Sequence, residues 1–238
     1  DVLKNVSMTF PEKGMTAIVG ESGCGKSTVV NMLIGAYRPK AGIVAVGGKP
    51  LESVTRESYY SHIASVSYNT YIFNDTVRAN FELAKQNVSD EEIWAALEKV
   101  NLAGFIKENG GLDKVITEDA NNVSGGQKQR LALAVNLVAD KDIYVFDEAT
   151  SNIDIESEAI IMHNIKAMSA EKAVVVISHR LANVVPADNI YYMEEGEVKE
   201  RGSHAQLMAA SGGYAKLFNA QKQLEEGYKE ITGAEVNA

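Results

Sequence analysis

Short apolar runs that alternate with amphipathic segments dominate the second half of this sequence. Residues 143–146 and 173–177 are continuous apolar runs, each short enough for a buried strand. Between them, residues 154–170 form an amphipathic segment with helical spacing. A buried strand, an amphipathic helix and a second buried strand are the pattern of a parallel sheet covered by helices. This part of the chain therefore predicts an α/β fold.

The first quarter of the chain adds the pattern of an antiparallel ribbon. Val6, Met8 and Phe10 alternate with polar residues, as in a half-buried strand. Residues 42–46 and the glycine pair that follows them predict another strand and a turn. We therefore expect an antiparallel β subdomain near the N-terminus.

Helical patterns replace the buried strands from about residue 75. Ser89 and Glu92 have the spacing of a capping box at the start of a helix. Further along, Ser124 is placed to cap a second helix. The apolar stripe of this helix comprises Leu131, Ala134, Val135 and Val138.

The last part of the chain predicts a hairpin that turns at Glu195 and Gly196, and a charged helix from Gly213. Together the patterns predict one domain over residues 1–238. We expect an α/β core with a mainly parallel sheet, into which a helical lobe is inserted. The core would comprise residues 1–74 and 140–238, and the lobe residues 75–139.

Composition narrows the classes of function. The chain has 23 basic and 32 acidic residues, a formal net charge of -9, which argues against a protein that mainly holds a nucleic-acid backbone. Its single cysteine, Cys24, cannot form an internal disulfide, which fits a reducing compartment. No apolar run approaches the roughly 18 residues that span a bilayer. Because the chain opens at Asp1 without a Met, we expect a domain cut from something longer, whose membrane function depends on another segment or polypeptide.

A glycine-rich stretch, GESGCGKST at residues 20–28, is the first candidate for chemistry. It follows a predicted buried strand at 15–19 and precedes a segment with helical spacing at 26–35. The stretch satisfies the pattern G-x-x-x-x-G-K-[ST], in which backbone N–H groups and a helix N-terminus cradle phosphates. This context predicts a P-loop NTPase core.

The residue types in this loop suggest separate roles. Lys26 would reach the outer phosphates, and Ser27 would bind Mg²⁺ through its hydroxyl group. The predicted nucleotide-binding residues of the loop are Gly20, Ser22, Gly23, Cys24, Gly25, Lys26, Ser27 and Thr28. The loop alone does not distinguish an ATPase from a GTPase or a kinase.

Three more side chains should lie at the same edge of the sheet. Asp147 ends the apolar run at 143–146, and its carboxylate could orient the water shell of Mg²⁺ at the carboxyl edge, where ligands of such sheets bind. Glu148 follows and is placed to polarise an attacking water. His179 comes just past the strand at 173–177, so it should reach a γ-phosphate or a water at this edge.

A second glycine-rich helix N-terminus lies far along the chain from the first. It comprises Ser124, Gly125, Gly126 and Gln127. Such a terminus could bind another face of a phosphate chain. The sequence alone leaves open whether it meets the phosphate loop of its own chain or that of a partner.

The order of these motifs resembles the nucleotide-binding (ATPase) domain of the ATP-binding cassette (ABC) transporters over almost the whole chain. GESGCGKST resembles the Walker A motif, and IYVFDE resembles Walker B with its catalytic glutamate. VSGGQKQR resembles the signature motif, with Val123 where Leu is usual. SNID resembles the D-loop, which places Asp154 at a dimer contact, and ISHR resembles the switch-histidine segment.

The resemblance implies a Mg²⁺-dependent ATPase in which two domains close head to tail around two ATP molecules. Each ATP would lie between the Walker A loop of one domain and the SGGQ segment of the other, with Glu148, His179, Lys26 and Asp154 in the catalytic site. Closure would drive transmembrane domains, so the resemblance places this domain at the cytoplasmic face of the membrane. The partner domain could be identical or different, and nucleic acid is not expected.

Several segments are similar to the exporter class of this family. IFNDTVRAN resembles the exporters' LFxxTIxxN stretch, and DEATSNID resembles their DEATSALD. Glu118 falls where exporters place the glutamate of the segment that contacts the transmembrane coupling helices. The resemblance thus implies the C-terminal half of an exporter whose transmembrane domain lies upstream in the same polypeptide.

The chain departs from the family pattern at a few positions. Tyr68 stands where the family has a glutamine that touches Mg²⁺, and a phenol is a poorer metal ligand than an amide carbonyl. Asn69 could substitute for it. Ala120 stands where exporters usually have glycine, and the aromatic residue that stacks on adenine is expected upstream of Asp1. We therefore expect slow turnover and poor affinity for ATP in the isolated domain.

Other classes of function fit the sequence less well. A soluble cassette ATPase acting on DNA or ribosomes is disfavoured by the acidic charge and by the exporter-like segments. The chain contains neither the N-K-x-D nor the D-x-x-G motif of a GTPase, and no segment resembles the substrate lid of a kinase. A regulatory domain that binds ATP but hydrolyses little is favoured by Tyr68 and disfavoured by Glu148, His179 and Asp154.

Overall fold

The computed structural model describes residues 2–68, 71–117 and 122–232 of the chain. Within these residues, a six-stranded sheet has the order β4-β5-β6-β1-β7-β8. The first five strands in this order run parallel, and β8 is antiparallel to β7. The strands are β1 (Gly14–Gly20), β4 (Ile63–Ser67), β5 (Ile143–Asp147), β6 (Ala173–Ile177), β7 (Asn189–Glu194) and β8 (Glu197–Gly202). The predicted α/β fold with a mainly parallel sheet is confirmed.

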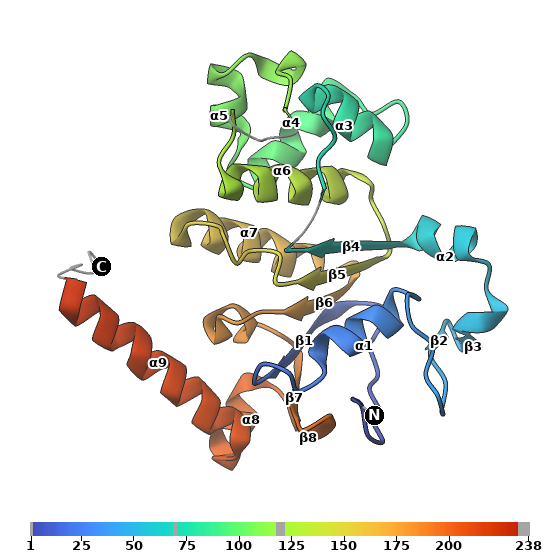
Figure 1. Ribbon diagram of the computed structural model, residues 1–238, viewed down its shortest axis with the longest axis vertical. Helices are drawn as coiled ribbons and strands as arrows, with labels where there is room; N and C mark the ends of the chain where they lie inside the picture. Colours follow the sequence, from blue (N-terminus) through green and yellow to red (C-terminus); the bar gives the residue numbers. More distant parts are fainter. Residues whose placement is uncertain (1, 69–70, 118–121, 233–238) are drawn as a thin grey trace.

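The helices are distributed on both faces of the sheet and beyond one edge (Figure 1). Helices α3, α4 and α5 lie together beyond β4, and α6 lies between them and the sheet. The α-helices are α1 (Lys26–Leu33), α2 (Arg56–His62), α3 (Val77–Ala84), α4 (Asp90–Lys99), α5 (Ala103–Glu108), α6 (Gly125–Val138), α7 (Ile155–Met168), α8 (His204–Ala210) and α9 (Gly213–Thr232). Short 3₁₀ helices are η1 (Leu51–Ser53), η2 (Gly111–Asp113) and η3 (Leu181–Val184).

Two apolar cores lie on opposite faces of the sheet because successive side chains of a strand point to opposite sides. In β5, Tyr144 and Phe146 belong to the larger core, which also contains the buried faces of α3 to α7. Val145 belongs to the smaller core, which contains the buried residues of α1 and α2. The central strands are therefore buried on both faces, which explains why their sequences are continuously apolar.

Local signals in the sequence define several ends of elements. The predicted capping box at Ser89 and Glu92 opens α4, with the Glu92 amide donating to the Ser89 hydroxyl at 3.2 Å. A second capping box opens α6, where Ser124 and Gln127 each accept the other's backbone N–H. The predicted hairpin between β7 and β8 is also confirmed.

The N-terminal segment differs from its prediction. Val6, Met8 and Phe10 are partly buried against the smaller core, as their alternation indicated, but residues 2–13 form no strand. At Thr9 the backbone N–H donates to the Tyr191 hydroxyl at 2.9 Å, and the Tyr191 hydroxyl donates to the Thr9 carbonyl at 3.1 Å. The backbone at Thr9 is thus bonded to a side chain and not to a neighbouring strand. The alternation of apolar and polar residues indicated only which side chains are buried.

The predicted strand at residues 42–46 is shorter than expected. Only β2 (Ala45–Val46) forms, and it pairs with β3 (Lys49–Pro50) in a two-stranded antiparallel ribbon. Beyond this pair, the Leu51 N–H donates to the Val44 carbonyl at 2.8 Å, and the chain then enters η1 at Leu51. Within the described residues, this two-stranded ribbon is all that forms of the predicted antiparallel β subdomain near the N-terminus.

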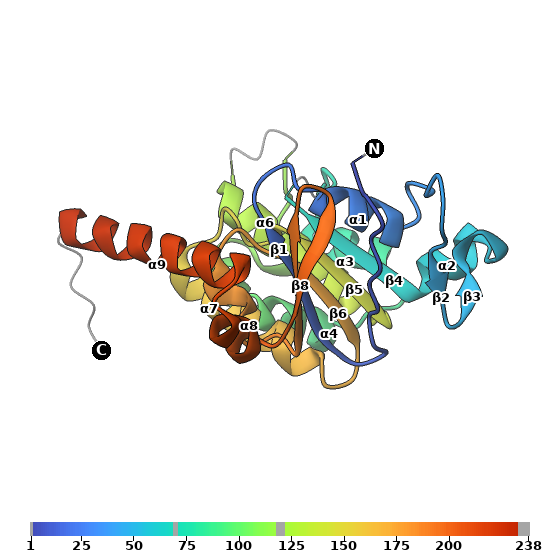
Figure 2. The ribbon, with the colours of Figure 1, turned by 90° about the horizontal axis from the view of Figure 1, so that it is seen from below.

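Helix α9 projects from the body of the molecule, at the end opposite the β2–β3 ribbon (Figure 2). Leu217 and Phe218 pack against the larger core, whereas Leu224 is largely exposed. Among the described residues, no helix combines the length and the apolar character that crossing a membrane requires.

Candidate functional site

The phosphate loop, residues 20–28, connects β1 to α1 as predicted. Gly20 has φ +150° and its missing Cβ would lie 2.2 Å from the Met193 carbonyl oxygen, so no larger residue fits there. Lys26 is buried, and its Nζ donates to the carbonyl oxygens of Gly20 and Glu21, both at 2.8 Å. Of the predicted residues, Gly20 and Thr28 are partly exposed, Ser22, Gly23 and Ser27 are exposed, and Cys24, Gly25 and Lys26 are buried.

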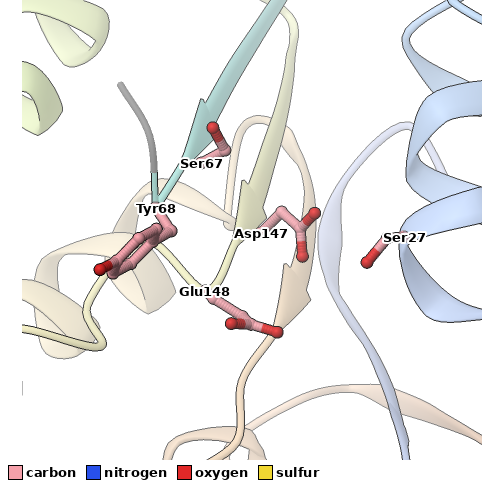
Figure 3. Close-up of a pocket in the computed structure, with 5 residues that line it drawn as sticks. All are labelled: Ser27, Ser67, Tyr68, Asp147 and Glu148. Atoms are coloured by element: carbon pink, nitrogen blue, oxygen red, sulfur yellow. The ribbon is translucent and has the colours of Figure 1, made fainter. Parts of the chain in front are cut away.

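A pocket of about 190 Å³ lies beside this loop at the carboxyl edge of the sheet (Figure 3). Ser27, Ser67, Tyr68, Asp147 and Glu148 line it. Figure 3 shows the Ser27 hydroxyl and the Asp147 carboxylate on facing sides of the pocket, with the Glu148 carboxylate next to them. The parallel register explains the gathering, since Ser67 at the end of β4 is the partner of Asp147 at the end of β5.

Asp147 has the environment of a cation ligand. Its Oδ1 atom is buried and, within the described part of the chain, has no hydrogen-bond partner. Burial raises the pKa of this carboxyl group above its ordinary value, and the neighbouring Glu148 raises it further, while Lys26 and His179 act in the opposite direction. A buried carboxylate oxygen that faces a serine hydroxyl suits a hard cation such as Mg²⁺. The residues present therefore fit the predicted metal.

Glu148 and His179 are brought together from the ends of adjacent strands. His179 Nε2 lies 2.6 Å from Glu148 Oε1, and both side chains remain partly exposed. Glu148 has φ +55°, a left-handed conformation that costs energy in a residue with a side chain, and its N–H donates to the Ile177 carbonyl at 2.9 Å. This bond fixes the turn after β5 to the end of β6. The carboxylate and the imidazole could therefore act on the same water or phosphate oxygen.

The SGGQ segment does not join this pocket. Ser124, Gly125, Gly126 and Gln127 start α6, whose buried residues lie in the core on the other face of the sheet from α1. The Ser124 hydroxyl and the Gln127 side chain are used in the capping box. A Cβ on Gly126 would lie 2.9 Å from the Asn152 carbonyl oxygen, whereas one on Gly125 would meet nothing within 4 Å in the described part of the chain.

Asp154 begins α7 as its N-cap. Its Oδ1 accepts the Ser157 backbone N–H at 2.8 Å, and this bond is the main reason that the pKa of Asp154 is lowered. The residue is exposed.

Sequence reasoning missed Gln129, which joins α6 to the turn after β5. Its side chain is buried; Nε2 donates to the Glu148 carbonyl at 3.4 Å, and Oε1 accepts the Asn152 N–H at 3.2 Å. The sequence offered no signal for this residue, because Gln129 lies off the apolar stripe predicted for the helix.

Tyr68 lines the pocket, but its hydroxyl group points away from it. The side chain is 54% exposed, and Figure 3 shows its ring pointing away from Asp147 and Ser27. In this arrangement the phenol oxygen takes no place beside the candidate cation ligands. Asn69, Glu118 and Ala120, which the sequence also singled out, lie outside the described residues.

Alkylation of Cys24 should weaken ATP binding. Its buried Sγ lies 3.8 Å from Lys26 Nζ, so an added group would disturb the lysine that is predicted to hold the outer phosphates. We expect N-ethylmaleimide to reduce the affinity for ATP at least about tenfold, or ~1.4 kcal/mol, in a titration with a fluorescent ATP analogue. Cys24 is the only cysteine, so Cys24→Ala should be unaffected by the same treatment. Unchanged affinity after complete modification, checked by mass spectrometry, contradicts this expectation.

Comparison with known proteins gives consistent matches. A family model described as ABC transporter matches residues 3–151. An uncharacterized ABC transporter ATP-binding protein of Haemophilus influenzae is 45% identical over 232 residues, which are 98% of this chain and 41% of the relative. An ATP-dependent lipid A-core flippase of Haemophilus ducreyi is 39% identical over 221 residues, 92% of this chain and 38% of that protein.

A solved structure of a bacterial Atm1-family ABC exporter with ATP bound has a similar fold. The TM-score is 0.87 at 32% sequence identity, and the match covers 92% of this chain and 39% of that one. The chain thus spans about two fifths of the length of these similar proteins.

Proposed function

We propose that this chain pairs with a second domain of the same kind to power export through transmembrane domains. The premise is that the chain belongs to the ABC transporter family as one of its ATP-binding, ATP-hydrolysing domains. The observation that carries the proposal is the division of the predicted ATP-binding residues. The phosphate loop, Asp147, Glu148 and His179 lie at one edge of the sheet, while no residue of SGGQ lines the pocket there. A partner that supplies its own SGGQ segment would complete the site.

In the proposed mechanism, the loop N–H groups and Lys26 hold the phosphates of ATP. Ser27 and Asp147 would hold Mg²⁺, which neutralises charge on the phosphates when bound. Glu148 accepts a proton from the attacking water through the carboxylate oxygen that is not paired with His179. His179 Nε2, which lies 2.6 Å from Glu148 Oε1, holds this carboxylate in position and would turn its N–H to the γ-phosphate of bound ATP. The two side chains thereby orient the water for attack.

An exposed aromatic surface on the segment before α3 is suited to contact transmembrane domains at the cytoplasmic face of a membrane. Tyr71 and Phe73 are more than half exposed and make an edge-to-face ring contact, with centroids 5.1 Å apart. Buried Asn80 fixes this segment, accepting the Phe73 N–H at 2.8 Å and donating to the Phe73 carbonyl at 3.1 Å. Exposed aromatic side chains on a rigid backbone favour binding to another protein.

Two inactive variants should restore activity to each other if the site is shared. Lys26→Ala removes the proposed phosphate-binding lysine. Gly125→Asp adds a side chain to SGGQ at a position where a Cβ meets nothing within 4 Å in the described part of the chain. Each alone should be inactive. Mixed in equal amounts, they should regain about a quarter of the wild-type ATPase rate, because half of the dimers are mixed and each of these has one intact site.

The controls for this experiment are the circular dichroism spectrum and thermal unfolding of each variant. An active Gly125→Asp protein contradicts the role of SGGQ. If both variants are folded and inactive but the mixture stays inactive at concentrations where the wild-type rate per molecule has saturated, the shared site is contradicted.

Replacement of Tyr68 by glutamine should accelerate turnover. The amide oxygen is a better metal ligand than the phenol, so we expect the kcat for Mg²⁺-ATP to rise roughly two- to tenfold. Tyr71→Gln is a matched control, because Tyr71 is similarly exposed and does not line the pocket. An unchanged rate in Tyr68→Gln would show that this position does not limit hydrolysis in the domain.

A further inference from the structure

Glu158 is a buried carboxylate near the start of α7, and it has no role in the ATP hydrolysis proposed above. The residue is only 4% exposed. Its Oε1 accepts hydrogen bonds from Thr150 Oγ1 at 2.6 Å and Asn183 Nδ2 at 2.9 Å, and its Oε2 accepts one from Arg180 Nη1. Both oxygens are therefore held by donors that come from outside α7.

These donors belong to the two loops that carry the reacting side chains. Thr150 is two residues after Glu148, and Arg180 directly follows His179. The second loop is itself closed, because Ser178 Oγ accepts from the Arg180 N–H at 3.1 Å and from Asn183 Nδ2 at 3.2 Å. Glu158 thus ties the turn after β5 to the turn after β6.

We propose that Glu158 is a positioning residue for ATP hydrolysis, which maintains the contact between Glu148 and His179. The inference rests on the proposed roles of those two residues. Glu148 holds a left-handed conformation, and such a conformation persists only where surrounding contacts enforce it. A displacement of about 1 Å in a catalytic group can lower a rate about 10²-fold, so a bridge between the two loops affects the chemistry without touching substrate.

The test compares Glu158→Gln with Glu156→Gln. Both substitutions neutralise a glutamate near the start of α7, but Glu156 is exposed and points away from the core. In Glu158→Gln we expect kcat for ATP to fall roughly 10- to 100-fold, with KM within about twofold of the wild-type value. Glu156→Gln should keep both constants. Thr150→Val removes one hydroxyl donor at nearly constant volume and should give a smaller fall in kcat. It replaces Glu158→Gln as the test variant if Glu158→Gln does not fold.

A second readout separates positioning from loss of stability. The His179 ring resonance, assigned by its absence in His179→Ala, reports the contact with Glu148 without any ATP. Glu158→Gln and Thr150→Val should shift this resonance as Glu148→Gln does, and Glu156→Gln should not. In a double-mutant cycle, Glu158→Gln should change kcat less than about twofold when His179 is already alanine.

Two results overturn the inference. One is a His179 resonance that moves in Glu148→Gln but stays at its wild-type position in Glu158→Gln and Thr150→Val. The other is a fall in kcat from Glu158→Gln that is as large in the His179→Ala background as in wild type. If Glu148→Gln itself leaves the resonance unmoved, the proposed Glu148–His179 pair fails instead, which is a separate outcome for the proposed function.

Discussion

Glu148→Gln should hydrolyse ATP at least about 10²-fold more slowly than the wild-type domain, since general-base catalysis contributes about 10²- to 10⁴-fold. Glutamine has nearly the same shape but cannot accept the proton of the attacking water. Nothing in the substitution disturbs the phosphate loop, so ATP affinity should change little. Because hydrolysis no longer separates the proposed pair, the variant should also form more dimer in ATP, measured by sedimentation velocity.

Glu195→Gln is the matched control for this variant. Glu195 also has a positive φ, +49°, but it lies in the exposed turn between β7 and β8. A change of similar size in both variants would point to backbone strain rather than to proton transfer. A Glu148→Gln protein that retains more than about a tenth of the wild-type rate would contradict a general base at this position.

The placement of the side chains that we propose to react was predictable from sequence because it follows from strand direction. Asp147, Glu148 and His179 each come within two residues of the end of an apolar run, and parallel strands end at the same edge. The structure accordingly places Glu148 and His179 in contact. The helix starts were predictable for a similar reason, because a capping box is a local interaction within four residues.

The contacts that support these residues could not be predicted in the same way. Glu158 and Gln129 have partners 8 to 25 residues away along the chain, and only the fold decides which loops reach them. The left-handed conformation of Glu148 also depends on a bond to the neighbouring strand. The N-terminal strand failed as a prediction because alternation records burial of side chains and says nothing about the partner of the backbone.

Asp147→Asn should impair hydrolysis and yet stabilise the protein in the absence of nucleotide. Asparagine cannot supply the carboxylate charge for Mg²⁺, so we expect activity or Mg²⁺ affinity to fall about 10- to 100-fold, the range for groups that support a metal site. The ionised carboxylate, by contrast, is a cost to the folded state without metal. It is partly buried, one oxygen has no partner in the described part of the chain, and Glu148 repels it.

The pH dependence of that gain in stability has a definite sign. The folded-state pKa of Asp147 is raised above its ordinary value of 3.8, mainly by burial, so the folded state binds this proton more tightly than the unfolded state does. Wild-type stability from this group is therefore full below 3.8 and is lost as pH rises through the folded-state pKa. Asp147→Asn cannot ionise, so in EDTA its melting temperature should exceed that of the wild type at pH 7, and the difference should shrink as pH falls toward 4.

Asp142→Asn separates this effect from any general consequence of removing a carboxylate. Asp142 precedes the same strand at its opposite end, where its exposed side chain contacts His62 at 2.5 Å. Its replacement should leave ATP hydrolysis unchanged and should not raise the melting temperature, because no buried charge is relieved. A lower melting temperature for Asp147→Asn than for wild type at pH 7 in EDTA would show that the carboxylate stabilises the fold. The energetic basis for assigning it to Mg²⁺ would then be lost.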